Sequence, residues 1–175
     1  MLALVFSFCL GAVSDPLSVV APPVMCDPLN AKLSASTGSP IQLSEFRGGP
    51  LVIFYEDQAS VKVNKPLKDE LWNRRPQLAS TQAHIVGIAN LQPYDFFPIR
   101  GFAFERIRAM EKRTGIPILI DLKGALSAAP WSLPANGSTV LLVDKDGHLL
   151  FRKTGALSTV EVKQVVQDLE KLTRA

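Results

Sequence analysis

Cysteine and histidine are scarce in this chain, which has two of each among its 175 residues. Both cysteines lie near the N-terminus, Cys9 within an apolar run and Cys26 within a proline-rich segment. If the apolar run is removed as a signal peptide, Cys26 is the only thiol that remains, and an internal disulfide is excluded. Neither His84 nor His148 has a partner at the spacing of a metal site, so the sequence assigns no metal and favours structural roles for both.

Dense basic segments are also missing. The formal net charge is +3, and 20% of the residues are charged. The most basic segment, "ERIRAMEKR", is interrupted by glutamates, which is typical of a solvated helix face and not of a nucleic-acid-binding stripe. We therefore expect no nucleic-acid partner.

An apolar run long enough to cross a membrane is missing too. The run from Leu2 to Val13 falls short of the roughly 20 residues that a bilayer requires. Its length and the small residues Ala12 and Ser14 are typical of a signal peptide, although no Lys or Arg precedes it. We expect a signal peptide over residues 1–14, a periplasmic or secreted location, and no transmembrane segment in the mature chain.

The apolar content, 47%, is sufficient for the core of one domain. Residues 15–39 are rich in proline and serine and show no clear period, so we interpret them as an extended lead-in. Residues 40–175 are predicted to form the single domain.

Strands and helices alternate along this domain. Pro66 fits the first turn of a helix that begins near Lys65, where its missing N–H costs no hydrogen bond. The segment Asp144–Gly147 predicts a tight hairpin turn, and Ser158 and Glu161 have the spacing of a capping box before a terminal helix. Apolar periodicity predicts strands at 51–55, 84–90, 116–121, 138–144 and 148–155. It places the helix that contains Pro66 at 64–74 and predicts another helix at 102–115.

This order predicts a three-layer α/β sandwich. Buried strands that alternate with helices indicate a central mixed sheet with parallel core strands and cover on both faces. The C-terminal β-hairpin supplies an antiparallel edge, and the last helix follows it.

Two segments of the sequence resemble a known superfamily. "IQLSEFRGGPLVIFY" is similar to the peroxiredoxin and TlpA-type branch of the thioredoxin-like superfamily. "STVLLVDKDGHLLFRKTGALSTVEVKQVVQDLEKL" is similar to the periplasmic YtfJ-like family within it. The resemblance covers residues 40–172 and implies a thioredoxin-like fold.

The resemblance also identifies what the chain lacks. In thioredoxins a Cys-x-x-Cys pair follows the first central strand at a helix N-terminus, where the helix dipole lowers the pKa of the first thiol. The matching positions here are Ala59 and Lys62. Ser138 matches the superfamily's cis-proline, and a trans peptide bond is expected before it. Thiol–disulfide exchange and peroxidase activity are not expected, because the turn supplies no thiolate.

The turn after the first central strand carries Glu56, Asp57 and Lys62, and two interpretations of it remain open. Carboxylates near a cation can transfer protons, which would make the turn a site of non-thiol enzyme chemistry. Alternatively, these groups form a polar cap with surface ion pairs. The sequence assigns no catalytic residue and no cofactor.

The aromatic loop "YDFFPIRGFAF" follows the second central strand. Phe96 and Phe97 either cap the core or form a rim with Arg100 that binds a peptide or protein. The carboxyl ends of parallel strands meet at one edge of a sheet, so this loop should lie near the turn.

We interpret the chain as a non-catalytic binding or assembly module of the periplasm with a possible envelope protein or peptide partner. Its candidate binding residues are Glu56, Asp57, Lys62, Phe96, Phe97, Arg100 and Ser138. A single-thiol redox role for Cys26 is a further alternative.

Overall fold

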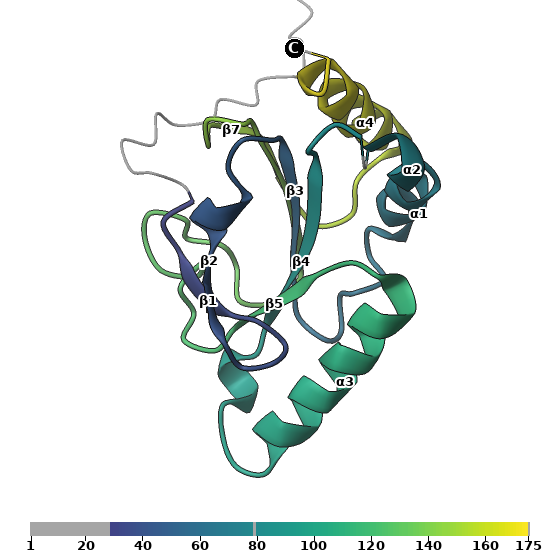
Figure 1. The fold of residues 1–175 in the computed structure, drawn as a ribbon. Helices are drawn as coiled ribbons and strands as arrows, with labels where there is room; N and C mark the ends of the chain where they lie inside the picture. Colours follow the sequence, from purple (N-terminus) through teal and green to yellow (C-terminus); the bar gives the residue numbers. More distant parts are fainter. Residues whose placement is uncertain (1–28, 79, 175) are drawn as a thin grey trace, which may run out of the picture.

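The computed structural model describes residues 29–78 and 80–174 (Figure 1). The predicted signal peptide, both cysteines and the first part of the lead-in lie outside the described residues. The expectations for these segments therefore stay predictions.

A seven-stranded mixed sheet forms the centre of the described part. Its strands are β1 (Lys32–Ser34), β2 (Pro40–Gln42), β3 (Leu51–Glu56), β4 (His84–Asn90), β5 (Ile118–Asp121), β6 (Ser138–Val143) and β7 (Leu149–Thr154). Their spatial order is β2-β1-β5-β4-β3-β6-β7. Strands β3, β4 and β5 are parallel, whereas the β6–β7 hairpin and the β1–β2 hairpin are antiparallel additions at either side. The predicted α/β fold class is confirmed, and the described end of the lead-in contributes β1 to the sheet.

The helices connect these strands largely as predicted. They are α1 (Lys65–Asn73), α2 (Arg75–Leu78), α3 (Ile99–Thr114) and α4 (Thr159–Leu172), with the 3-10 helices η1 (Leu43–Phe46) and η2 (Gln92–Tyr94). Pro66 lies in the first turn of α1, as expected. Helix α3 ends at Thr114 and is capped by Gly115, which has a φ of 62°. It begins three residues earlier than predicted, directly after its N-cap residue Pro98. Among the described helices, none is long and apolar enough to cross a membrane.

Helix α4 has the predicted capping box. The hydroxyl of Ser158 accepts the N–H of Glu161 at 3.3 Å, and the Glu161 carboxylate accepts the N–H of Ser158 at 2.8 Å. The Ser158 N–H and the Lys153 ammonium lower the pKa of Glu161 to about 2. The carboxylate therefore stays ionised, and the cap persists at neutral pH.

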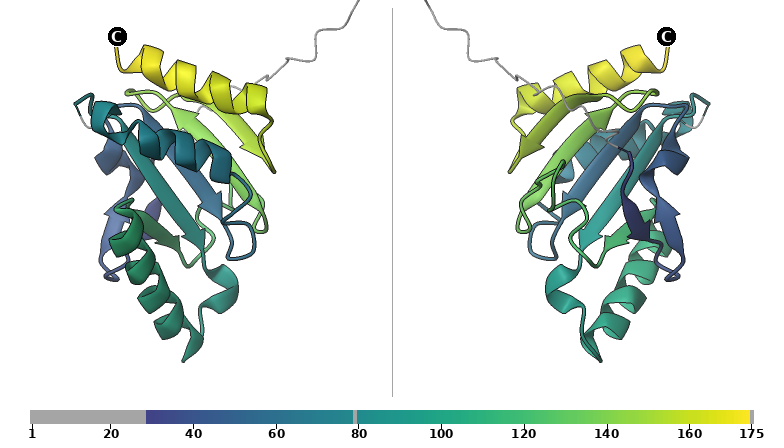
Figure 2. Two further views of the ribbon diagram at one scale, coloured as in Figure 1. Left: turned by 90° about the vertical axis from the view of Figure 1, so that its right-hand side faces the viewer. Right: turned by 90° about the vertical axis from the view of Figure 1, so that its left-hand side faces the viewer.

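All four α-helices pack on one face of the sheet (Figure 2). Helices α1, α2 and α4 share a core with β3 and β6 that includes Val52, Phe54 and Leu142. Helix α3 packs separately, through Ile107, on β5 and the end of β4. The opposite face is covered by segments with little regular structure, which bury Leu29, Leu43, Leu126, Trp131 and Leu133. The sheet is covered on both faces, as predicted, but only one of the covering layers is helical.

The turn between β6 and β7 is the predicted tight hairpin. Asp144 accepts the N–H groups of Asp146 and His148 at 2.9 and 2.8 Å, and Gly147 has a φ of 96°. The sequence showed no metal-site spacing here, yet the turn brings ligand atoms of Asp144, Asp146 and His148 within 4.8 Å of one another. Because the turn itself engages Asp144, the arrangement is that of a hairpin. The other histidine, His84, packs edge-on against the ring of Phe46, which is a structural contact.

Candidate functional site

The segment after β3 is a chain of short turns and not the start of a helix. Backbone hydrogen bonds of the i to i+3 type follow one another between Asp57 and Lys65, and α1 begins only at Lys65. Ala59 and Lys62, the positions matched to the Cys-x-x-Cys pair, therefore precede the helix N-terminus. The field of a helix dipole falls off within one turn, so a thiol at Ala59 would gain little activation from it.

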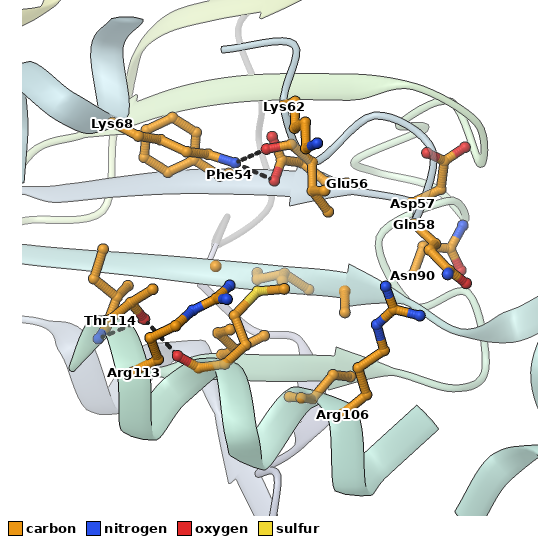
Figure 3. A pocket seen from close by; sticks show the side chains of 18 of the residues that line it. Phe54, Glu56, Asp57, Gln58, Lys62, Lys68, Asn90, Arg106, Arg113 and Thr114 are labelled. Atoms are coloured by element: carbon orange, nitrogen blue, oxygen red, sulfur yellow. Dashed lines mark hydrogen bonds and ion pairs between the residues drawn. The ribbon is translucent and has the colours of Figure 1, made fainter. Parts of the chain in front are cut away.

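The side chain of Glu56 is buried at the end of β3, with 8% of the residue exposed. One carboxylate oxygen accepts the hydroxyl of Ser138 at 2.8 Å, and the other accepts the ammonium of Lys68 at 2.5 Å. The same ammonium lies 5.1 Å from the ring centroid of Phe54, and Figure 3 shows Lys68 reaching across that ring to Glu56. Glu56 is therefore an internally compensated carboxylate.

The cation that Glu56 binds is Lys68, and not the Lys62 that the sequence placed in the same turn. Lys62 is exposed, and within residues 29–78 and 80–174 its side chain makes no ion pair or hydrogen bond. Because α1 begins after this turn, its fourth residue, Lys68, is the cation that the helix places beside the end of β3.

Asn64 is a buried residue that sequence reasoning missed. Its amide donates to the Ser138 hydroxyl at 2.8 Å and to the Gly155 carbonyl at 3.1 Å, and its side-chain oxygen accepts the N–H of Leu157 at 2.9 Å. These bonds fix the turn against the start of β6 and the connection from β7 to α4. The only sequence signal is an Asn directly before a Lys-Pro helix start, which predicts an ordinary N-cap; its side chain makes no cap bond.

Asp57 fixes the other end of the turn. Its two carboxylate oxygens accept the N–H groups of Ser60 at 2.8 Å and of Gly137 at 3.1 Å. Burial alone would raise the pKa of Asp57, but the hydrogen bonds from Ser60 and Gly137 outweigh it and lower the pKa below its usual value. A carboxylate that is held ionised in this way is a poor proton acceptor at neutral pH.

The residues Glu56, Asn64, Lys68 and Ser138 form what we call the polar cluster. Cis peptide bonds in the described part precede only Pro98 and Pro130, so the bond before Ser138 is trans, as predicted. Every buried side-chain nitrogen or oxygen in that part has a hydrogen-bond partner. Complete satisfaction is typical of a structural network, and it favours the polar-cap interpretation over enzyme chemistry at the turn.

The aromatic loop is divided between core and surface. Tyr94 and Phe104 are half-buried against the cluster around Ile107. Phe96 and Phe97, in contrast, are 56% and 95% exposed, so the interpretation that they cap the core is wrong. The exposed residues Phe96, Phe97, Ile99 and Phe102 form what we call the aromatic tip.

Arg100 lies beside the aromatic tip in a small ion-pair group. It donates to Asp95 at 3.2 Å, and Lys123 binds the same carboxylate at 2.7 Å. Since β3 and β4 are parallel neighbours, the loop and the turn leave the sheet at the same edge, as predicted. Glu56 is buried there, so it is not exposed beside the tip.

A groove of about 630 Å³ lies between α1 and α3, and Figure 3 shows it from close by. We call it the α1–α3 groove. At the C-terminal end of α3, the carbonyls of Thr114 and Gly115 accept hydrogen bonds from the guanidinium of Arg75, the first residue of α2, at 3.3 and 2.6 Å. The floor of the groove consists of side chains and one glycine from β3, β4 and β5: Phe54, Ile85, Gly87, Ala89 and Ile118. The sequence did not predict this groove, because periodicity does not show where two helices on one face fail to meet.

The fold places the chain in the thioredoxin-like class. An exposed lipoprotein thioredoxin from Streptococcus pneumoniae strain TIGR4 aligns with a TM-score of 0.59 and 16% identity, over 81% of this chain and 98% of that one. Peroxidoxin BcpB from Mycobacterium tuberculosis aligns with a TM-score of 0.54 and 22% identity, over 82% and 90%. At such identities the likeness shows the fold alone. The chain is a thioredoxin-fold protein whose turn after β3 carries no cysteine.

Within that class, residues 106–172 match the model of a family described as bacterial protein of unknown function (YtfJ_HI0045). The uncharacterized protein YtfJ of Escherichia coli (strain K12) is 39% identical over 56 residues, which are 32% of this chain and 30% of that protein. The match thus spans less than a third of that relative's length. The predicted resemblance to the thioredoxin-like superfamily and to YtfJ-like proteins is confirmed. The family-model match begins within α3, so the turn after β3 and the aromatic tip lie outside it.

Proposed function

We propose that the protein is an exported, non-catalytic binding module that holds an envelope protein or peptide through its aromatic tip. Eight large apolar residues are exposed in the described part, and four of them fall between Phe96 and Phe102. Exposed apolar side chains that gather in one place mark interaction sites, whereas single ones do not. This clustering is the observation that carries the proposal.

The surroundings of the tip support a protein partner. Arg100 lies beside the tip, and the aromatic-plus-arginine composition is the one that binding hot spots favour. Hydrogen bonds from Lys123 and Arg100 lower the pKa of Asp95, so this ion-pair group stays charged at neutral pH. Asp57 and Gln58 lie in the turn after β3, which leaves the sheet at the same edge as the loop after β4.

Export is supported by the apolar residues 2–13 and the small residues that follow them. One protein of similar fold is described as an exposed lipoprotein. An envelope protein or peptide is therefore the partner that we propose.

The absence of thiol chemistry is the first expected result. The purified protein should not accelerate insulin reduction by dithiothreitol or consume hydrogen peroxide above a protein-free blank. The physical reason is that Ala59 and Lys62 supply no attacking sulfur at the turn. Turnover in either assay, abolished by Cys26→Ser, would instead support the single-thiol alternative.

The second expected result concerns the tip. Phe96→Ala/Phe97→Ala should leave the thermal midpoint within about 2 °C of the original, because these rings bury little surface. Partner capture from an envelope extract of the protein's native cells should be lost. Val160→Ala on α4 is the matched control, since Val160 is 71% exposed and lies in another part of the fold.

Two outcomes would contradict the proposal. One is a double variant that stays folded and captures every partner that the original captures. The other is an original protein that captures no protein partner but floats with anionic lipid vesicles, together with a double variant that no longer floats. That result would assign the tip to a membrane surface.

A further inference from the structure

We propose that the α1–α3 groove binds an amphiphilic anion, namely an unbranched acyl chain with a carboxylate or phosphate head. This site is separate from the aromatic tip and does not depend on the proposed function. The groove volume, about 630 Å³, lies within the range of ligand pockets.

The floor of the groove suits a hydrocarbon chain better than a peptide. It is formed by side chains on β4 and its neighbours, and β4 is an interior strand that is paired on both sides. Its backbone groups are therefore already hydrogen-bonded. A peptide lying on this floor would leave its own N–H and C=O groups without partners, which is costly, whereas an acyl chain carries no such groups.

Gly87 makes room in the middle of that floor. In the sheet it lies between Phe54 on β3 and Ile118 on β5. A Cβ atom at Gly87 would be 3.5 Å from the nearest atom of Ile118, an ordinary contact, and the backbone there is not in the left-handed region. Neither packing nor conformation requires glycine, although glycine weakens a strand. The space that it leaves belongs to the groove.

The charges around the groove favour an anion. Three acidic residues line it, and each is already engaged: Glu56 by Lys68, Asp69 by Lys65, and Asp57 by the N–H groups of Ser60 and Gly137. Three further cations line it without an ion pair or side-chain hydrogen bond in the described part of the chain: Lys62, Arg106 and Arg113. The lining therefore has a surplus of positive charge.

Lys62 and Arg106 are the groups that we assign to the anionic head. Lys62 lies in the turn that leads into α1 and Arg106 lies on α3, so the two cations approach the groove from its two sides. Figure 3 shows Arg106 reaching from α3 toward the end of the groove where Gln58 and Asn90 lie. Arg113 is two helical turns further along α3, about 10 Å away, where salt screens most of its effect on that head.

Calorimetric titration of the purified protein with dodecanoate, below its micelle concentration, tests the proposal. We expect one saturable site with a Kd of about 10–100 µM, as a ligand of this size allows. Butyrate, which has the head without the chain, and dodecyltrimethylammonium, which has the chain with the opposite charge, should not bind detectably. A parallel titration with lysophosphatidate distinguishes the two kinds of head group. Tighter binding of dodecanoate would identify the ligand as a free fatty acid, and tighter binding of lysophosphatidate would identify it as a lipid phosphate.

Variants locate the site. Gly87→Leu should abolish dodecanoate binding without lowering the thermal midpoint, and Gly87→Ala is the smaller control that shows the strand tolerates a side chain. Arg106→Gln and Lys62→Gln should each weaken binding about tenfold, the value of a hydrogen bond to a charged group. Arg108→Gln is the matched control, because Arg108 lies on the same helix, does not line the groove and pairs with Glu105.

The results also separate this site from the aromatic tip. Phe96→Ala/Phe97→Ala should bind dodecanoate as the original does, and Gly87→Leu should still capture the protein partner. The proposal is overturned if no anion binds saturably, if the cationic amphiphile binds as tightly, or if Gly87→Leu binds unchanged. A larger loss from Arg113→Gln than from Arg106→Gln would contradict the position assigned to the head.

Discussion

Trp131→Ala is expected to lower the free energy of unfolding by about 3–5 kcal/mol, the usual cost of truncating a buried tryptophan. Trp131 is 6% exposed and belongs to the core on the non-helical face of the sheet. Its ring packs with Leu126 and Leu133, and these side chains cover the sheet on that face, where none of the described α-helices does. Removing it would leave a cavity that an irregular segment, tied down by its own hydrogen bonds, cannot close.

Trp72→Ala is the matched control, because it removes the same side chain from a different environment. Trp72 is 42% exposed on α1 and stacks on the guanidinium of Arg75 at 5.1 Å. Its loss should cost about 1 kcal/mol or less. Urea unfolding followed by far-ultraviolet circular dichroism measures both changes. Equal costs for the two variants would mean that the segment around Trp131 is a loose cover and not part of the core.

The irregular layer also explains what the sequence could and could not predict. Strands β3 and β6 are buried at every residue, so their continuous apolar runs predicted them within a residue or two. Helix α4 was predicted from its cap and its apolar stripe. The layer around Trp131 has no period to detect, because its apolar residues are placed by turns and by Asp121, which accepts the N–H groups of Ala125 and Leu126 at 2.8 and 2.9 Å. The strands β1 and β2 have three residues each, too few to show alternation.

The candidate site was predictable only in part, for a related reason. Sequence reasoning identified Glu56 and Ser138 separately, and the antiparallel register of β3 and β6 brings them together as directly opposed residues. It named Lys62 as the cation of a possible cluster because Lys62 lies in the same turn as Glu56 and Asp57. The predicted start of α1 near Lys65 was right, but a helix boundary does not show that the Lys68 side chain passes over the ring of Phe54 to the end of β3.

Lys68→Met is expected to lower the free energy of unfolding by about 3 kcal/mol, the lower end of the range for breaking a buried ion pair, since Lys68 is still partly exposed to solvent. Among the described residues, it would leave the Glu56 carboxylate with the Ser138 hydroxyl as its only side-chain partner. The control is Lys65→Met, three residues earlier on the same helix. Lys65 pairs with Asp69 at the surface, where both side chains are more than half exposed, and surface pairs contribute less than about 1 kcal/mol.

Adding Glu56→Gln to Lys68→Met separates a structural pair from a catalytic one. A neutral amide can still accept the hydroxyl of Ser138, and it removes the uncompensated charge, so most of the lost stability should return. The coupling between the two changes, measured by urea unfolding as a double-mutant cycle, should exceed about 1 kcal/mol. A Lys68→Met protein as stable as the Lys65→Met control would show that Glu56 does not need its cation for folding. That result would return Glu56 to consideration as an acid/base group, and with it the non-thiol enzyme alternative. The short contact of Glu56 with Lys68, the Ser138 hydrogen bond and the buried anchor of Asn64 lead us to expect the opposite: here the end of β3 carries a network that holds the fold together.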